Sequence, residues 1–304
     1  MDASPTATVA TATATAAVSA AIPRRQVDFA FDPAQVPADW YRDDAFLSTF
    51  LDALSLLFPE GERFFVESVK KLRHHVADPG LAAAVTGFIG QEAMHGKEHR
   101  AFNQMLAGHG LATAPRLERQ LEGLLRLVRR ALPARSQLAA TCALEHFTAM
   151  MAEAALRHAG MRDAMHPTVR PLWVWHALEE NEHKAVAFDV YRAAGGGYAR
   201  RAGIMLLTTL VFFAFTAWVH GHFLAERRLL LRPWRWARGL AHMWLYPGWF
   251  TRLVPAYLAY FRPGFHPDDR DTSTLLAAWR ERLFGEHGEL RDNLRGAWVT
   301  SEVA

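Results

Sequence analysis

From residue 40 onward, apolar residues recur at the three- and four-residue spacing of amphipathic helices, with no clear alternation of the kind that marks a strand. Gly108-His109-Gly110, Leu132-Pro133 and Gly195-Gly196-Gly197 end or interrupt these stretches. Pro59 either interrupts the first stretch or starts its second part. The pattern predicts five main helices, over residues 43–74, 81–107, 116–131, 135–158 and 167–193. The chain is therefore expected to be all-α.

Four glutamates on these helices are candidates, and three of them, Glu92, Glu145 and Glu180, interrupt apolar stretches, where a charge is rarely found unless it is paired or bound to metal. Two of the four have a histidine three residues later, and residues three apart share one face of a helix. Two Glu-x-x-His pairs, with one Glu from each of two further helices, make the dinuclear metal site of ferritin-like four-helix bundles. The predicted ligands are Glu62, Glu92, His95, Glu145, Glu180 and His183.

A single Glu-x-x-His is common on solvated helix faces. The prediction of a metal site therefore depends on the doubled motif and on the order of the four glutamates along the chain. Four carboxylates also balance the charge of two divalent ions, whereas without metal they would repel one another in a low-dielectric interior. The sequence therefore predicts a ferritin-like four-helix bundle that holds two metal ions.

Further polar residues flank these ligands. His176 lies four residues before Glu180 on the same helical stripe, which makes it a predicted third imidazole ligand. His99 is expected either to bind metal or to bond to a ligand carboxylate. Glu179 points off the stripe and suits a supporting hydrogen bond. His146 is a weaker candidate, because it lies about 100° around the helix from its neighbour Glu145.

Two resemblances follow from these motifs. The sequence is similar to the bacterial family named "predicted metal-dependent hydrolase" over roughly residues 30–290. The segments that carry this similarity are Phe58-Pro-Glu-Gly-Glu62, Gln91–His99, Glu145-His146, Glu179–Lys184 and Pro263–Pro267. The ligand pattern also resembles that of the di-iron arylamine N-oxygenases, whose additional His corresponds to His176 here. The first resemblance implies hydrolysis, and the second implies oxygen chemistry.

The types of donor atom limit which metals the site is expected to bind. Carboxylates with imidazoles suit iron, with manganese as the alternative, whereas zinc sites often use Cys and Cys142 is the only cysteine. We expect an O₂-activating oxygenase or oxidoreductase that acts on an apolar or amine small molecule and needs an electron donor. The alternatives are a two-metal hydrolase and a non-enzymatic metal-binding bundle.

A second informative region follows the bundle. Residues 203–219 contain no charge, and Arg227–Arg238 then combines five Arg with two Trp. This composition indicates association with a membrane surface through residues 203–261, at the inner face of the membrane. The alternative is a buried central helix of a soluble bundle. The net charge of +3 comes with no nucleic-acid motif, so a nucleic-acid partner is not expected.

The chain is thus expected to have four parts. Residues 1–28 are predicted to be a disordered Ala/Thr-rich tail, and residues 29–198 the bundle. Residues 199–262 form the apolar, Arg/Trp-rich helical region, and residues 263–304 a loop with an amphipathic helix from Thr274 to about Phe284. A single cysteine fits a reducing cytoplasm.

Overall fold

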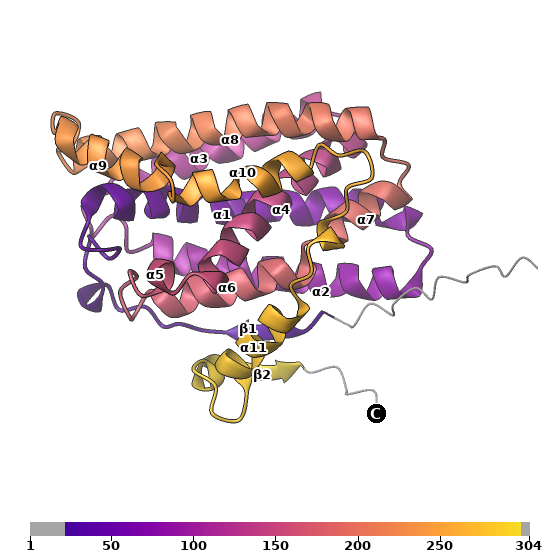
Figure 1. Ribbon diagram of the computed structural model, residues 1–304, viewed down its shortest axis with the longest axis horizontal. Helices are drawn as coiled ribbons and strands as arrows, with labels where there is room; N and C mark the ends of the chain where they lie inside the picture. Colours follow the sequence, from indigo (N-terminus) through magenta and orange to yellow (C-terminus); the bar gives the residue numbers. More distant parts are fainter. Residues whose placement is uncertain (1–21, 299–304) are drawn as a thin grey trace, which may run out of the picture.

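The computed structural model describes residues 22–298, and helices dominate this part of the chain (Figure 1). The longer helices are α1 (Ala45–Leu72), α2 (Pro79–Asn103), α3 (Ala114–Ala131), α4 (Ala134–Arg157), α6 (Arg170–His183), α7 (Val186–Ala193), α8 (Tyr198–Glu226), α9 (Pro233–Trp244), α10 (Trp249–Ala259) and α11 (Ser273–Phe284). The fold also contains a single turn, α5 (Ala159–Arg162), and two strands, β1 (Arg24–Val27) and β2 (Leu294–Trp298). Short 3-10 helices lie at Pro33–Gln35, Arg73–His75, Pro267–Asp269 and Arg291–Asn293. The prediction of an all-α bundle is confirmed.

Helices α1, α2, α4 and α6 form the bundle, with α1 packed on α2 and α4, and α4 packed on α6. Helix α1 begins at Asp44, whose carboxylate accepts hydrogen bonds from the backbone N–H groups of Phe46 and Leu47 at 3.0 and 3.1 Å. Pro59 lies inside α1, and the helix continues through it. Two apolar clusters pack against the inner faces of these helices and exclude water from the middle of the bundle.

The predicted helix over residues 167–193 is in fact two helices. Helix α6 ends at His183, and α7 begins at Val186. Neither proline nor glycine marks the break, and the apolar positions continue across it, so helical periodicity alone could not show it. The position of α7 as a separate helix instead depends on its tertiary contacts with α2 and α4.

The predicted tail over residues 1–28 is wrong for its last part. Residues 1–21 lie outside the described residues, but Arg24–Val27 form β1, which pairs antiparallel with β2. Val27 is buried against the bundle. The strand depends on hydrogen bonds to a segment near the other end of the chain, and no local pattern reveals such a pairing. The C-terminal part likewise contains β2 in addition to the expected helix, which begins at Ser273 as α11.

Candidate metal centre

Seven buried side chains converge in the middle of the bundle. Helix α1 contributes one Glu, α2 a Glu-x-x-His pair, α4 one Glu, and α6 a Glu-x-x-His pair with a further His one turn earlier. They are Glu62, Glu92, His95, Glu145, His176, Glu180 and His183, and each is at most 4% exposed. Their donor atoms form overlapping groups of three within 4.8 Å: Glu62/His95/His176, Glu92/His95/Glu180 and Glu92/Glu145/His183.

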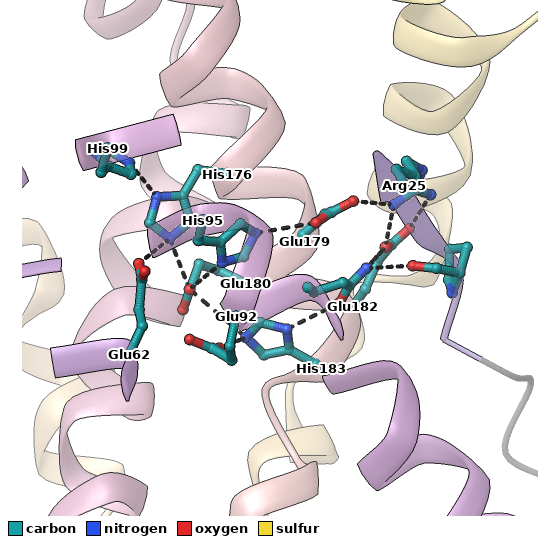
Figure 2. Close-up of polar contacts among 12 residues, drawn as sticks. Arg25, Glu62, Glu92, His95, His99, His176, Glu179, Glu180, Glu182 and His183 are labelled. Atoms are coloured by element: carbon teal, nitrogen blue, oxygen red, sulfur yellow. Dashed lines mark hydrogen bonds and ion pairs between the residues drawn. The ribbon is translucent and has the colours of Figure 1, made fainter. Parts of the chain in front are cut away.

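Glu180 lies at the centre of this cluster (Figure 2). Its Oε1 is 2.9 Å from His176 Nε2, 3.6 Å from His95 Nδ1 and 3.7 Å from His183 Nε2. Glu62 Oε1 lies 3.6 Å from His176 Nε2 on one side. On the other side, His183 Nε2 lies 3.0 Å from Glu92 Oε1 and 3.4 Å from Glu145 Oε2. A single carboxylate thus lies between two groups of potential donor atoms.

Close helix packing helps to bring Glu62 to the cluster. Gly96 follows His95 on α2, and a Cβ atom at position 96 would lie 3.2 Å from Glu62 Oε2. The absence of a side chain there lets the Glu62 carboxylate approach α2. Gly96 therefore contributes to the site by leaving room for the Glu62 carboxylate, and not as a ligand.

Many donor atoms of the cluster have no hydrogen-bond partner among the described residues. These are both carboxylate oxygens of Glu62, Glu92 and Glu145, together with Glu180 Oε2, His95 Nδ1 and His183 Nε2. An unsatisfied buried polar group costs about 1–3 kcal/mol, and more when it is charged. Metal ions bound by these atoms would remove that cost, so the donors present fit a metal centre.

The charges of the cluster carboxylates also fit a metal centre. Burial, followed by repulsion from neighbouring carboxylates, raises the pKa of Glu62 and of Glu145 well above the usual range. Burial also raises the pKa of Glu92 to about 7. Burial acts to raise the pKa of Glu180 too, but the neighbouring His176 and His183 rings hold it well below its usual value. The cluster is thus short of positive charge, which divalent cations supply.

Two of the imidazoles are oriented by partners outside the cluster. His95 Nε2–H donates to Glu179 Oε2 at 3.1 Å, which leaves His95 Nδ1 facing the cluster. His183 Nδ1–H donates to Gln91 Oε1 at 3.0 Å, which leaves His183 Nε2 facing the cluster. The Gln91 amide is itself held, because its Nε2 donates to Glu182 Oε2 at 2.8 Å. Such supporting bonds fix the tautomer of a metal-binding histidine.

The third imidazole is oriented by a chain of hydrogen bonds that starts at Asn103. Asn103 Nδ2 donates to the Ser55 carbonyl at 3.0 Å, so its Oδ1 accepts from the Ser55 hydroxyl at 2.7 Å. Since that hydroxyl proton is used, Ser55 Oγ accepts from His99 Nδ1 at 2.8 Å. Burial lowers the pKa of His99 well below its usual value, so its ring is neutral and Nε2 carries a lone pair.

His99 Nε2 therefore accepts from His176 Nδ1–H, at 2.7 Å. This assignment leaves the lone pair of His176 Nε2 directed at the cluster, as a metal ligand requires. His99 thus lies outside the cluster and orients His176. Among the other predicted residues, Glu179 contacts His95, whereas the structure does not bring His146 to the cluster. His146 Nε2 lies 3.0 Å from the carbonyl of Ala256 on α10 instead.

Sequence reasoning missed four of the supporting residues: Ser55, Gln91, Asn103 and Arg25. Arg25 Nη1 donates to Glu179 Oε1 and to Glu182 Oε2, both at 2.7 Å (Figure 2). Only Gln91 carried a signal, because it lies inside the motif around Glu92. Arg25 lies far from α6 in the sequence, and its role depends on the pairing of β1 with β2.

A family model described as "predicted metal-dependent hydrolase" matches residues 23–271. The chain belongs to this family. The match covers every residue of the cluster and also β1, which holds Arg25. No curated protein and no solved structure matches the chain. Metal dependence is thus stated by the family description, and the His/Glu cluster supplies suitable donors.

Two apolar cavities reach the His/Glu cluster of this family member. The first, of about 100 Å³, extends from His176 and Glu180 to Trp249 and Phe250 of α10. The second, of about 150 Å³, lies between α1, α3, α4 and α8 and reaches Glu62. Both are lined almost wholly by apolar side chains, and Leu54, Phe58, Thr148 and Met151 line both. Both routes to the cluster are therefore surrounded by apolar side chains.

Proposed function

We propose that the cluster binds two divalent metal ions and that the protein is a metal-dependent hydrolase of an apolar substrate. The observation that carries this proposal is the set of buried carboxylate and imidazole atoms without hydrogen-bond partners, which gather in overlapping groups of three around Glu180. The family description supports the hydrolytic reaction. It fits better than the oxygenase expected from the ligand pattern, which no comparison supports.

Two divalent ions at such a site supply Lewis acidity and a nucleophile derived from water at neutral pH. The protein's own residues contribute orientation and exclusion. Glu179, Gln91 and His99 hold the three imidazoles in the tautomers that direct a lone pair at the cluster. The apolar walls of the two cavities keep bulk water away and position an acyl chain. An ester with a long apolar acyl group fits this arrangement.

One observation favours a second candidate. The cluster offers four carboxylates and three imidazoles, a donor set that suits iron or manganese and that helical bundles use for O₂ chemistry. Under this alternative the apolar cavities would hold a substrate for oxidation. Both candidates need the same ligands, so only the reaction separates them.

The test begins with metal analysis of protein purified without oxygen. We expect two metal ions per chain, and loss of both in the Glu92→Ala/Glu180→Ala double variant. Glu281→Ala, at an exposed position of α11, is the control and keeps both ions. Two metals per chain retained after the double substitution would show that the site is assigned wrongly.

The reaction is then assayed with p-nitrophenyl esters of short and long acyl chains, with and without O₂. The hydrolase proposal expects metal-dependent cleavage that is independent of O₂ and favours the longer acyl chain. Rapid oxidation of the reduced centre by O₂ without ester cleavage would replace it with the oxygenase. Protein that binds no metal would reject both.

A further inference from the structure

We infer that α8, α9 and α10 form a docking surface for an anionic lipid bilayer, and that the cavity beneath α8 receives an apolar molecule from that bilayer. The first part stands independently of the reaction. The second part rests on the proposed function, because it takes the metal centre to be the destination of the apolar molecule.

Helix α8 presents an apolar outward face where a soluble protein would present a polar one. It is long and apolar enough to cross a membrane, but only 17% of its most apolar stretch is buried in the protein. Leu206 and Leu210 are 59% and 69% exposed, and Trp218 is 52% exposed. Along this face, from Gly203 to Trp218, the exposed residues include no charge. Exposed apolar area of this kind marks an interaction site.

The inward face shows that α8 lies on the bundle rather than crossing a bilayer alone. Met205, Val219 and Phe223, near its two ends, are fully buried, and α8 packs along both α1 and α4. Figure 1 shows α8 lying lengthwise over these helices. A helix held in this way can only present its outer side to a membrane, as interfacial helices do.

Helices α9 and α10 extend the apolar surface. They contact α8 through Phe213, whose ring lies 6.1 Å from Trp244 and 5.6 Å from Phe250. Nearly all strongly exposed large apolar residues in the described chain lie in this region, with Leu127 of α3 outside it. They are Tyr198, Leu206, Leu207, Leu210, Val211, Trp218, Leu230, Leu231, Trp234, Leu240, Trp244, Leu245, Tyr246, Val254 and Leu258. This set includes Trp and Tyr residues, which suit the headgroup layer of a membrane.

The charge of this surface selects the lipid. The chain has no carboxylate between Glu226 and Asp268. Arg228, Arg232, Arg235 and Arg238 form no salt bridge with any described residue, whereas Arg227 pairs with Asp39. Unpaired Arg beside exposed Trp and Leu complements anionic headgroups over an apolar interior. A second copy of the chain would place these like charges against one another, so a bilayer is the better partner.

The cavity that reaches Glu62 opens at the same surface. Leu207 and Val211 of α8 line it and are also 48% and 37% exposed. Leu124 and Val128 of α3 form the opposite side of the opening. An apolar chain that leaves the bilayer between α3 and α8 therefore reaches the metal centre without crossing water.

Docking is tested by sedimentation of the purified full-length protein with vesicles of phosphatidylcholine, alone or mixed with phosphatidylglycerol. We expect binding to the mixed vesicles, and at least tenfold weaker binding for Leu206→Glu/Leu210→Glu. The matched control is Ala82→Glu/Thr86→Glu, which adds the same charge at the same spacing on α2, across the bundle from α8 (Figure 1). Arg232→Gln and Arg238→Gln should each weaken binding about fivefold, and only on the anionic vesicles.

Two results would overturn the docking surface. One is wild-type protein that binds neither vesicle. The other is a stable dimer in solution that Leu206→Glu/Leu210→Glu converts to monomer, which would assign this face to a second copy of the chain. Circular dichroism and metal content of each variant establish that its fold is intact.

The cavity between α3 and α8, as a passage for an apolar chain, is tested separately by an experiment that needs no turnover. Gly61 lines the cavity next to Glu62, and a Cβ at position 61 would meet no atom within 4 Å. Gly61→Phe should fill the cavity and weaken binding of cis-parinaric acid, a fluorescent fatty acid, at least tenfold, while metal content and vesicle binding stay unchanged. Equal binding of the fatty acid by both proteins would overturn the passage. Normal binding without any ester cleavage would leave the passage standing and count against the hydrolase alone.

Discussion

At the scale of single residues, the candidate centre depends on which ring nitrogen of each histidine carries the proton. For His95 and His183, a single hydrogen-bond acceptor determines which nitrogen is protonated. For His176, the position of the proton depends on a chain of hydrogen bonds that runs from Asn103 through Ser55 and His99. A hydroxyl that touches no proposed ligand can therefore determine which nitrogen of His176, two side chains away, carries the proton.

Ser55→Ala tests this chain. The change removes the acceptor of His99 Nδ1–H, so His176 is free to turn its Nε2–H toward Glu180. We expect metal affinity to fall about 10–100-fold, measured by competition with a chelator. Thr49→Ala is the control, because the Thr49 hydroxyl is equally buried in α1 but bonds only to backbone carbonyls. An equal loss in both variants would point to general destabilisation instead.

Asp52 provides a pH-dependent prediction away from the centre. Burial raises its pKa from 3.8 to about 7, although Trp40 Nε1–H donates to its Oδ1 at 2.8 Å. Because the folded state binds this proton more tightly than the unfolded state, stability falls as pH rises from about 4 to about 7. The difference corresponds to about 4 kcal/mol.

Asp52→Asn cannot ionise, so its free energy of unfolding should lose this part of the pH dependence. Urea unfolding at pH 5 and pH 8 measures the effect, with the exposed Asp43→Asn as control. If wild-type protein and Asp52→Asn respond identically to pH, the carboxyl of Asp52 titrates normally in the fold.

At the scale of elements, β1 acts as a strap that ties the bundle to the C-terminal segment. It pairs with β2, and Arg25 reaches from it to Glu179 and Glu182 of α6. Arg280 of α11 also pairs with Glu182, at 2.6 Å. Ion pairs therefore connect β1, α6 and α11. The strap therefore contributes both to stability and to the position of His95, through Glu179.

Arg25→Met should be strongly destabilising, because it leaves the buried Glu179 carboxylate without its cation. Breaking one side of a buried pair costs about 3–5 kcal/mol, which urea unfolding would measure. Metal affinity should fall as well, since Glu179 orients His95. Arg24→Met, at an exposed position of the same strand, should change neither quantity by much. Similar losses in both variants would contradict the role given to Arg25.

At the scale of the whole molecule, the bundle concentrates four carboxylates in an interior that two apolar clusters keep dry. Binding of metal should therefore stabilise the entire fold. Chelation is expected to lower the free energy of unfolding by about 3–4 kcal/mol relative to protein with free metal at on the order of 100–1,000 times Kd.

Glu145→Gln should act in opposite directions in the two states. It removes one of the mutually repelling charges and so raises the melting temperature of the metal-free protein, yet it weakens metal binding. Differential scanning calorimetry with and without chelator measures both effects. A lower melting temperature in both states would indicate that Glu145 is a structural residue.

Local spacing along the chain was sufficient to predict the ligand motif and most of the bundle helices. Residues three or four apart must share a helix face, so Glu92 with His95 and Glu180 with His183 could be paired from the sequence. Pro59 and the break after His183 were not determined in this way, since periodicity continues across both positions. The tertiary structure decided what surrounds the ligands. Arg25, Ser55 and Asn103 support the ligands indirectly, through Glu179 and His99, and His146 turns to α10, because hydrogen-bond partners depend on proximity in space and not on distance along the sequence.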